Sequence, residues 1–218
     1  TAKKFAKSGY QVAMIARDNI RLSKLEKELP NSKAFICDVS DIDKLKNTCK
    51  KIKKEMGSPE VLIHNAVKGN FEKLLEGKPE WLEENFRINT TSLMYLAHEL
   101  IPNMITNKKG VIIVTGNTAA KRGVANTPYF APTKAAQRIL AQSLAKDFGP
   151  KGIHVAYIMI DAFINTPWTR KRIPAQIDQP DNIFTQPKEI AEEIYHIAHQ
   201  NRSAWSFDVE IRPDIEKW

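Results

Sequence analysis

Residues 110–115 read Gly-Val-Ile-Ile-Val-Thr, and this almost wholly apolar run is the clearest indication of the fold. A strand with one face in water alternates apolar and polar residues, whereas a strand covered on both faces is apolar throughout. Similar short runs, rich in Val and Ile, recur at residues 11–16, 33–37, 61–65, 153–160 and 206–211. Together they predict the buried strands of a parallel sheet.

Longer segments between these runs carry apolar residues three and four positions apart, which is the spacing of a helix with one buried face. They cover residues 1–8, 20–29, 41–56, 80–105, 127–148 and 187–200. Such alternation of strands and helices predicts an α/β fold, a doubly wound parallel sheet with helices on both faces. The sequence contains no linker, repeat or low-complexity tract, so we expect a single domain over residues 1–218.

The composition suits an ordinary globular protein. Of the 218 residues, 42% are hydrophobic, and the nine glycines bring the apolar share to about 46%. No apolar run approaches the roughly 18 residues of a membrane span, and residues 1–5 lack a signal-peptide core. We therefore expect a cytoplasmic protein without membrane association. Neither the two cysteines nor the five histidines show the spacing of metal ligands.

The net charge of +8 suits an anionic partner, such as a phosphorylated small molecule or a nucleic acid. The densest group of cations, Lys50, Lys51, Lys53 and Lys54, lies on one predicted amphipathic helix. It has no interleaved aromatic residues and no nucleic-acid-binding motif, so a solvated basic surface is favoured. We therefore expect no nucleic-acid partner. Binding to a nucleic-acid duplex that weakens steeply with salt would instead support a nucleic-acid-binding protein.

Several short motifs share the order and spacing of one known family, although each is weak alone. They are the strand-like residues 11–18, the pair Asp38-Val39, the turn at 64–67, Asn89, the strand-like residues 110–115, Lys134 with two small neighbours, and residues 161–166. Over residues 1–192 they resemble the short-chain dehydrogenase/reductase family. The resemblance implies a Rossmann-like sheet, a dinucleotide cofactor and a small-molecule substrate.

The resemblance also implies a first strand and a Gly-rich loop that this sequence does not contain. No strand precedes the first predicted helix, and no G-x-G-x-x-G turn occurs in the chain. In the family's strand order, 3-2-1-4-5-6-7, residues 11–16 and 61–65 flank that first strand. We therefore expect these two strands to run parallel without hydrogen bonds between them.

The resemblance implies four catalytic positions, two of which are changed here. Asn89 and Lys134 match the family's Asn and Lys. Phe130 stands four residues before Lys134, where the family has its proton-donating Tyr, and Asn117 stands where the family has a Ser. Phe has no proton to exchange, whereas the Asn117 amide can still bind a carbonyl oxygen. The alternative interpretation of Asn117 is a turn residue after the strand.

Two nearby side chains are candidates to replace the missing phenol. Tyr129 is adjacent to Phe130, but each residue turns a helix by about 100°, so the two rings cannot face the same way. A distorted helix start near Pro132 could bring the Tyr129 hydroxyl in, and a contact at the helix entrance is the other interpretation. Thr118, next to Asn117, also offers a hydroxyl.

The cofactor prediction rests on Arg17, which follows the second strand of the family pattern. An acidic residue there binds the ribose hydroxyls of NAD, whereas a cation favours the 2′-phosphate of NADP. The sequence therefore favours NADP over NAD, unless Arg17 is only a solvated cation. The resemblance implies the remaining cofactor contacts: Asp38, Val39, Asn65, Lys134 and Thr166.

The resemblance implies an oxidoreductase that transfers a hydride between NADP(H) and a carbonyl or alcohol substrate. The changed site leaves a second hypothesis, a non-catalytic protein that binds a dinucleotide or metabolite on the same fold. Residues 167–186 occupy the place of the family's substrate lid. The family pairs its two long helices, here 80–105 and 127–148, between subunits, so we expect a homodimer or homotetramer. Small residues on these helices suit that pairing: Ala97, Ala131, Ala135, Ala141 and Ala145.

Overall fold

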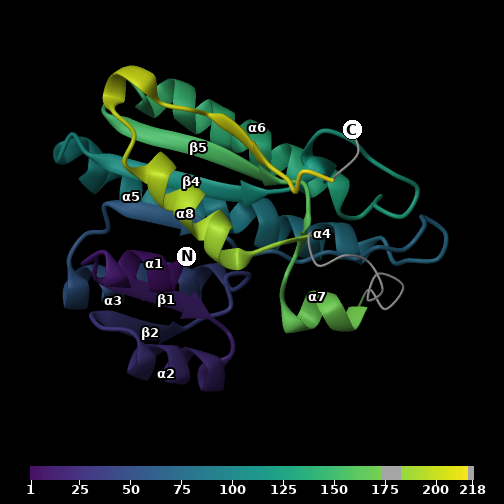
Figure 1. The fold of residues 1–218 in the computed structure, drawn as a ribbon, viewed down its shortest axis with the longest axis horizontal. Coiled ribbons are helices and arrows are strands. Elements are labelled where there is room, and N and C mark those ends of the chain that lie inside the picture. Colours follow the sequence, from purple (N-terminus) through teal and green to yellow (C-terminus); the bar gives the residue numbers. More distant parts are fainter. Residues whose placement is uncertain (173–182, 216–218) are drawn as a thin grey trace.

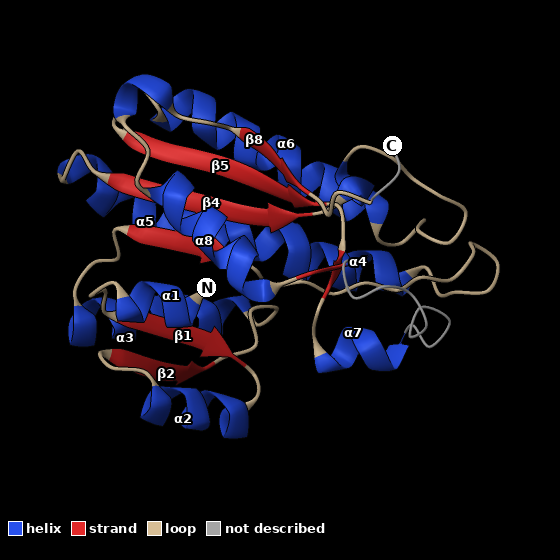
Figure 2. Ribbon diagram, viewed as in Figure 1, coloured by secondary structure: helices blue, strands red, loops and turns tan. Residues whose placement is uncertain are grey.

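The computed structural model describes residues 1–172 and 183–215, and its strands pair in parallel groups (Figures 1 and 2). The smaller group pairs β1 (Val12–Ala16) with β2 (Ser32–Ile36). The larger group has the order β3 (Val61–His64), β4 (Gly110–Gly116), β5 (Ile153–Ile160) and β8 (Asp208–Ile211). All of these strands lie where the sequence predicts them. A separate short pair, β6 (Phe163–Ile164) with β7 (Phe184–Thr185), was not predicted.

The helices lie between the strands in chain order. They are α1 (Ala2–Lys7), α2 (Asn19–Glu28), α3 (Ile42–Met56), α4 (Glu80–Phe86), α5 (Ser92–Thr106), α6 (Ala131–Phe148), α7 (Pro167–Arg172) and α8 (Pro187–Ala198). A π-helical turn, Arg87–Thr91, joins α4 to α5, so the predicted helix at 80–105 is one irregular unit. The predicted lid at 167–186 lies partly outside the described residues; its described parts are α7 and β7. Among the described helices, none has the length and hydropathy required to cross a membrane.

Helices cover both faces of the larger sheet, which confirms the predicted doubly wound α/β fold (Figure 2). On β4, Ile112 and Val114 pack with α5 and α6 on one face. Ile113, which points to the opposite face, packs with α1 and α8. The continuous apolar run at 110–115 therefore reflects burial on two sides, and every residue of β5 is buried for the same reason.

The strands β1 and β3 belong to different sheets, and no hydrogen-bonded register joins them in the described part of the chain. This agrees with the expectation that the two strands are not directly paired. In Figure 2 the arrows of both groups point the same way. Helix α1 packs against both groups, because Phe5 lies in the core of the larger sheet and Ala6 in that of the smaller. On the other face, Leu45 of α3 packs with Leu96 of α5.

We predict that Phe5→Ala weakens the link between the two sheets. Truncating a buried aromatic side chain of this size costs about 3–5 kcal/mol of unfolding free energy, and Phe5 is buried against both α8 and the larger sheet. Chemical denaturation followed by circular dichroism measures the change. Ile20→Ala, at an exposed position on α2, is the matched control and should change stability by no more than about 0.5 kcal/mol. A loss below about 1 kcal/mol for Phe5→Ala, well short of that cavity cost, would contradict the bridging role.

Candidate functional site

Four of the predicted site residues follow the carboxyl ends of parallel strands. Arg17 follows β1, Asp38 lies two residues beyond β2, Asn65 follows β3 and Asn117 follows β4. The carboxyl ends of parallel strands form the edge where α/β sheets bind ligands. Figure 2 shows the arrowheads of both strand groups on the same side of the molecule. The strands therefore bring these four residues to one edge.

Lys134, in the first turn of α6, is the central ionisable group of this edge. Its side chain is buried, with 2% of the residue exposed. The amine donates to the carbonyl of Thr115 at 3.2 Å and to Oε1 of Gln137. The third N–H position has no partner among the residues that the structure describes. Burial lowers the pKa of Lys134 from 10.5 to about 7, so the amine changes charge near neutral pH.

Gln137, one turn further along α6, connects Lys134 to two other elements. Its Nε2 donates to the main-chain carbonyl of Asn89 at 2.6 Å and lies 3.1 Å from Nδ1 of His64. The other ring nitrogen of His64 lies 2.8 Å from the Ser92 hydroxyl, which donates to a carbonyl in the preceding turn. These side chains form a continuous buried chain of hydrogen bonds between α6, β3 and α5.

His64 is neutral in this chain. Burial first, and the charge of Lys134 second, lower the pKa of His64 to about 3. A neutral imidazole has one donor and one acceptor nitrogen. Because the Gln137 amide donates to Nδ1, we assign the ring proton to Nε2, which donates to Ser92.

Asn89 lies in the π-helical turn Arg87–Thr91 and is fully buried. Its Oδ1 accepts the Lys68 N–H at 2.9 Å, and its Nδ2 donates to the Lys68 carbonyl and the Thr133 hydroxyl, both at 2.8 Å. Both amide hydrogens are therefore used to hold the segment after β3 and the start of α6. Asn89 is linked to Lys134 only indirectly: its main-chain carbonyl accepts a hydrogen bond from Gln137, which contacts Lys134.

Phe130 stands at the N-terminal boundary of α6, and its carbonyl accepts the backbone N–H of Lys134 at 3.2 Å. The buried ring packs against Phe71, with 5.0 Å between the ring centroids. Tyr129 is also buried, but its hydroxyl donates to the Leu74 carbonyl at 2.5 Å. That bond commits the Tyr129 hydroxyl to the loop before α4, in agreement with the helix-period argument against it.

Asn117 lies in a turn, and its side-chain oxygen is unpaired among the described residues. Its main-chain carbonyl accepts the Ala120 N–H at 3.0 Å, which closes a turn after β4. Its side-chain Oδ1 is buried and has no hydrogen-bond partner in the described part of the chain. The preceding residue, Gly116, has to lack a side chain, because a Cβ there would lie 1.8 Å from the Tyr157 hydroxyl oxygen. Asn117 thus carries an unused acceptor at the carboxyl edge.

Arg17 and Asp38 lie together at the ends of β1 and β2. A guanidinium nitrogen lies 3.7 Å from a carboxylate oxygen, and the Arg17 side chain is 71% exposed. The other carboxylate oxygen of Asp38 accepts the N–H and the hydroxyl of Ser40. Burial alone would raise the pKa of Asp38, but the Ser40 hydrogen bonds and the Arg17 charge outweigh it and lower that pKa below its usual value. Such an exposed cation with one loose ionic contact can pair with a second anion.

The remaining predicted cofactor residues have structural contacts of their own. The Asn65 side-chain oxygen accepts the Thr115 hydroxyl at 2.7 Å, next to the carbonyl that binds Lys134. Val39 is half-buried against the cluster between α3 and α5. The Thr166 hydroxyl oxygen accepts the Thr169 N–H at 3.1 Å and so caps the start of α7. Asn65 therefore joins the Lys134 region, whereas Thr166 belongs to the segment that leads into α7.

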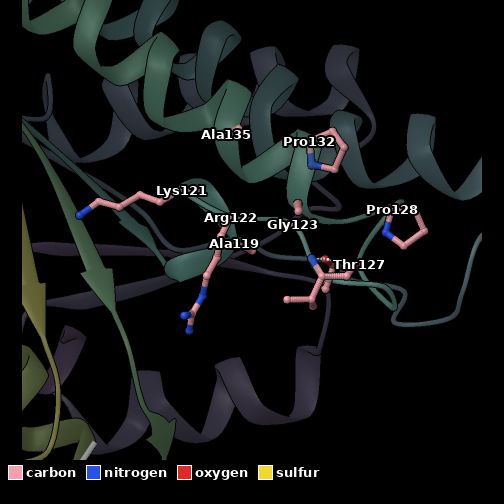
Figure 3. Close-up of a pocket in the computed structure, with 11 residues that line it drawn as sticks. Ala119, Lys121, Arg122, Gly123, Thr127, Pro128, Pro132 and Ala135 are labelled. Atoms are coloured by element: carbon pink, nitrogen blue, oxygen red, sulfur yellow. Dashed lines mark hydrogen bonds between the residues drawn. The ribbon is translucent and has the colours of Figure 1, made fainter. Parts of the chain in front are cut away.

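A hollow of about 310 Å³ lies beside the start of α6 (Figure 3). Figure 3 shows Pro132 and Ala135 of α6 on one side, whereas Lys121 and Arg122 extend away from Pro132. The full lining is residues 119–124, Thr127, Pro128, Ala131, Pro132 and Ala135. Lys134 is not part of this lining, so the hollow opens on the neighbouring face of α6.

Gln137 is the site residue that the sequence analysis missed. It is fully buried on α6, whose other buried residues include Lys134 as well as small and apolar side chains such as Ala141 and Leu144. Residues three apart on a helix are neighbours, so its position relative to Lys134 was a usable signal. The contact between Gln137 and Asn89 left no usable signal in the sequence, because it depends on how the π-helical turn packs against α6.

The chain resembles known proteins in sequence and in fold. Dehydrogenase/reductase SDR family member 6 of Aquarana catesbeiana is 32% identical over 175 residues, 80% of this chain and 69% of the relative. The L-sorbose reductase of Gluconobacter frateurii, solved with NADPH and L-sorbose, has a TM-score of 0.88 at 21% identity, with 97% and 89% of the two chains covered.

A short-chain oxidoreductase of Pseudomonas aeruginosa PAO1, solved with NADPH and described as containing an atypical catalytic center, has a TM-score of 0.87 at 20% identity. The match covers 99% of this chain and 91% of that one. At these identities the two solved structures establish the fold alone. The family model for short chain dehydrogenases matches residues 1–176. The chain therefore belongs to the short-chain dehydrogenase family.

Proposed function

We propose that the chain is an NADP(H)-dependent oxidoreductase that acts on a small carbonyl or alcohol substrate through an atypical site. Phe130 occupies the position of the catalytic Tyr, and Asn117 that of the Ser. The observation that carries the proposal is the buried network of Lys134, Gln137 and Asn89 at the carboxyl edge of the sheet. Burying an ammonium costs several kcal/mol, and strongly perturbed ionisable groups in such places mark functional sites.

The residues at this edge have the chemistry that NADP(H) requires. The exposed Arg17 guanidinium suits the 2′-phosphate that distinguishes NADP from NAD. Lys134 has one N–H position left for a ribose hydroxyl, and Asn117 has an unpaired side-chain oxygen for a donor. Asp38, Val39, Asn65 and Thr166 complete the proposed contact set. When bound, the cofactor supplies or accepts the hydride.

The chain's own residues orient the reactants and control access. Asn117 is suited to binding the substrate oxygen, since its amide both donates and accepts. Phe130 and Phe71 present apolar surface and exchange no proton. Because the Tyr129 hydroxyl is bound to Leu74, the proton has to come from water, Thr118, another group of the site or the substrate. Loss of a positioned acid costs about 10²–10⁴ in rate, so we expect slow turnover.

The solved relatives support this assignment. Both proteins named above were solved with NADPH, and one is described as containing an atypical catalytic center. A site on this fold that departs from the family pattern is thus compatible with NADPH binding. The family's reductases and dehydrogenases carry the proposal of a carbonyl or alcohol as the substrate class.

A non-catalytic dinucleotide-binding or metabolite-binding protein is the second candidate. The observation in its favour is the pair of buried rings at the proton-donor position, where neither Phe130 nor Tyr129 presents a free hydroxyl. The two candidates share cofactor binding and differ in turnover. NADPH consumption with a panel of aldehydes and ketones separates them.

We also propose the cytoplasm as the place of action. Cys37 and Cys49 are both buried and both free thiols. Burial raises the pKa of Cys49 to about 11, which keeps the thiol protonated and unreactive. Unpaired cysteines are typical of reducing compartments.

We predict assembly into a dimer or tetramer through α5 and α6. Ala97, Ala131 and Ala141 are buried within the chain and cannot contact a second subunit. We therefore expect the contact between subunits to involve exposed apolar side chains such as Met94 and Ile139, which are 50% and 54% exposed. Light scattering at micromolar concentration should show the assembly.

In the same assay, Ile139→Asp should shift the protein towards monomer, because it places a charge in the proposed interface. Ile20→Asp, on exposed α2, is the matched control and should leave assembly unchanged. A monomeric parent protein would refute the proposal.

We predict that Arg17 selects NADP. Arg17→Ala should weaken NADPH binding about 10- to 100-fold, because a hydrogen bond to a charged group contributes about 1.5–3 kcal/mol, and should leave NADH binding unchanged. Titration calorimetry with both cofactors measures the difference between the NADPH and NADH affinities. Arg21→Ala, another exposed arginine nearby, should bind both cofactors as the parent does. Equal affinities of the parent for NADPH and NADH would sink this prediction.

We predict that Phe130→Tyr raises or creates reductase activity, by up to about 10²–10⁴-fold. The new phenol would stand one helical turn before Lys134, whose charge lowers the pKa of a neighbouring phenol. NADPH oxidation with an aldehyde substrate reports the change. Phe71→Tyr adds a hydroxyl to the partner ring and serves as the control. A parent that is already fast, with a slower Phe130→Tyr variant, would show that another group supplies the proton.

A further inference from the structure

The Gln137 side chain uses both ends of its amide on buried partners from three elements. Its oxygen accepts from the Lys134 amine on α6. Its nitrogen donates to the Asn89 carbonyl in the π-helical turn and to Nδ1 of His64 on β3. Every donor of the amide is therefore satisfied, with no part of the side chain in water.

This set of partners permits only one orientation of the amide. A flipped Gln137 would direct N–H groups at the Lys134 amine, which in its charged form can only donate. It would also direct a carbonyl oxygen at the Asn89 carbonyl, which can only accept. Leaving such buried groups unpaired costs about 1–3 kcal/mol each. The His64 ring reinforces the choice: the Ser92 hydroxyl donates to the Ile88 carbonyl and so accepts from Nε2 of His64, which leaves Nδ1 to accept from Gln137.

The Lys134 amine is consequently held at two of its three N–H positions. The Thr115 carbonyl and the Gln137 oxygen are acceptors, and both bonds persist whether the amine is charged or neutral. Only the third position changes when the proton leaves. Gln137 thus determines which direction of the amine remains open for a hydroxyl of a bound ligand.

Among the neighbouring polar groups, Gln137 has the greatest influence on the charge state of the Lys134 amine. The amine contacts Thr115 of β4 and Gln137 of α6, and Gln137 in turn contacts Asn89 of the π-helical turn and His64 of β3. Of these only His64 titrates, and it is neutral at physiological pH. Burial is the cause that lowers the pKa of Lys134, so a charge placed at residue 137 would act on the amine at hydrogen-bond distance.

We propose that Gln137 is a positioning residue for Lys134: anchored by Asn89 and His64, its amide fixes the amine and sets the balance between its charged and neutral forms. The role concerns the same site as the proposed oxidoreductase function and rests on it for its catalytic meaning. The arrangement itself belongs to the polypeptide and can be measured without cofactor.

The test is an NMR titration of Lys134 in the whole chain, with lysines labelled at the ε-carbon and the Lys134 signal assigned by its loss in Lys134→Met. The parent should show one lysine that titrates near pH 7, far below the usual value of about 10.4. Gln137→Glu places a carboxylate beside the amine and should raise this pKa by about 1–3 units. Gln137→Leu removes the acceptor and should lower it.

Gln11→Glu adds the same charge at an exposed position and is the matched control, expected to leave Lys134 unchanged. A merely structural Gln137 would alter stability in both variants without moving the Lys134 titration in opposite directions. An unshifted titration in folded Gln137→Glu and Gln137→Leu would overturn the proposal. So would a parent in which Lys134 titrates at the usual lysine value, a result that requires no variant to fold.

The pH profile of NADPH-dependent carbonyl reduction links the proposal to function. One inflection in that profile should move to higher pH in Gln137→Glu, by the same amount as the pKa of Lys134. An inflection that stays fixed while the NMR titration shifts would overturn the positioning role in catalysis. If no carbonyl is reduced at all, the proposed function fails, whereas the NMR result still decides whether Gln137 controls the amine.

Discussion

The contact between α6 and the π-helical turn at Asn89 constrains the rest of the site. Lys134 and Gln137 carry an amine and an amide into a region closed to water. Each buried polar group costs about 1–3 kcal/mol if it is left unpaired, so the fold has to deliver acceptors from β3, β4 and the π-helical turn at once. The hydrogen bonds that satisfy α6 therefore also fix the relative positions of the elements that carry the candidate site.

The main elements of the fold were predictable because they depend on burial, which the residue pattern records. The apolar runs of β4 and β5 predicted strands covered on both faces, and both are covered by helices. The π-helical turn at Arg87–Thr91 was not predicted as such. The apolar spacing that predicted the helix at 80–105 lies after the turn, in α5, and the turn is held by a tertiary contact, the Asn89 amide bound to Lys68. The pair β6 and β7 is too short to leave a pattern.

The candidate site was predictable where one residue carries the signal. Lys134, Asn89 and Asn117 were proposed from their places in a family pattern; Gln137 joins Lys134 to Asn89, and Asn117 follows β4. Tyr129 and Phe130 have different partners, Leu74 and Phe71 respectively. Gln137 was missed, because its role depends on contacts with residues about 48 and 73 positions away.

Hydride transfer is the central claim, and isotope transfer tests it most directly. The chain would be mixed with NADPH that carries deuterium at the transferable position and with a panel of aldehydes and ketones, and the products would be analysed by mass spectrometry. The account predicts that at least one carbonyl becomes an alcohol that contains one deuterium, formed in step with NADPH oxidation. Tight NADPH binding with no labelled alcohol from any carbonyl would contradict it and would favour a binding protein on the same fold.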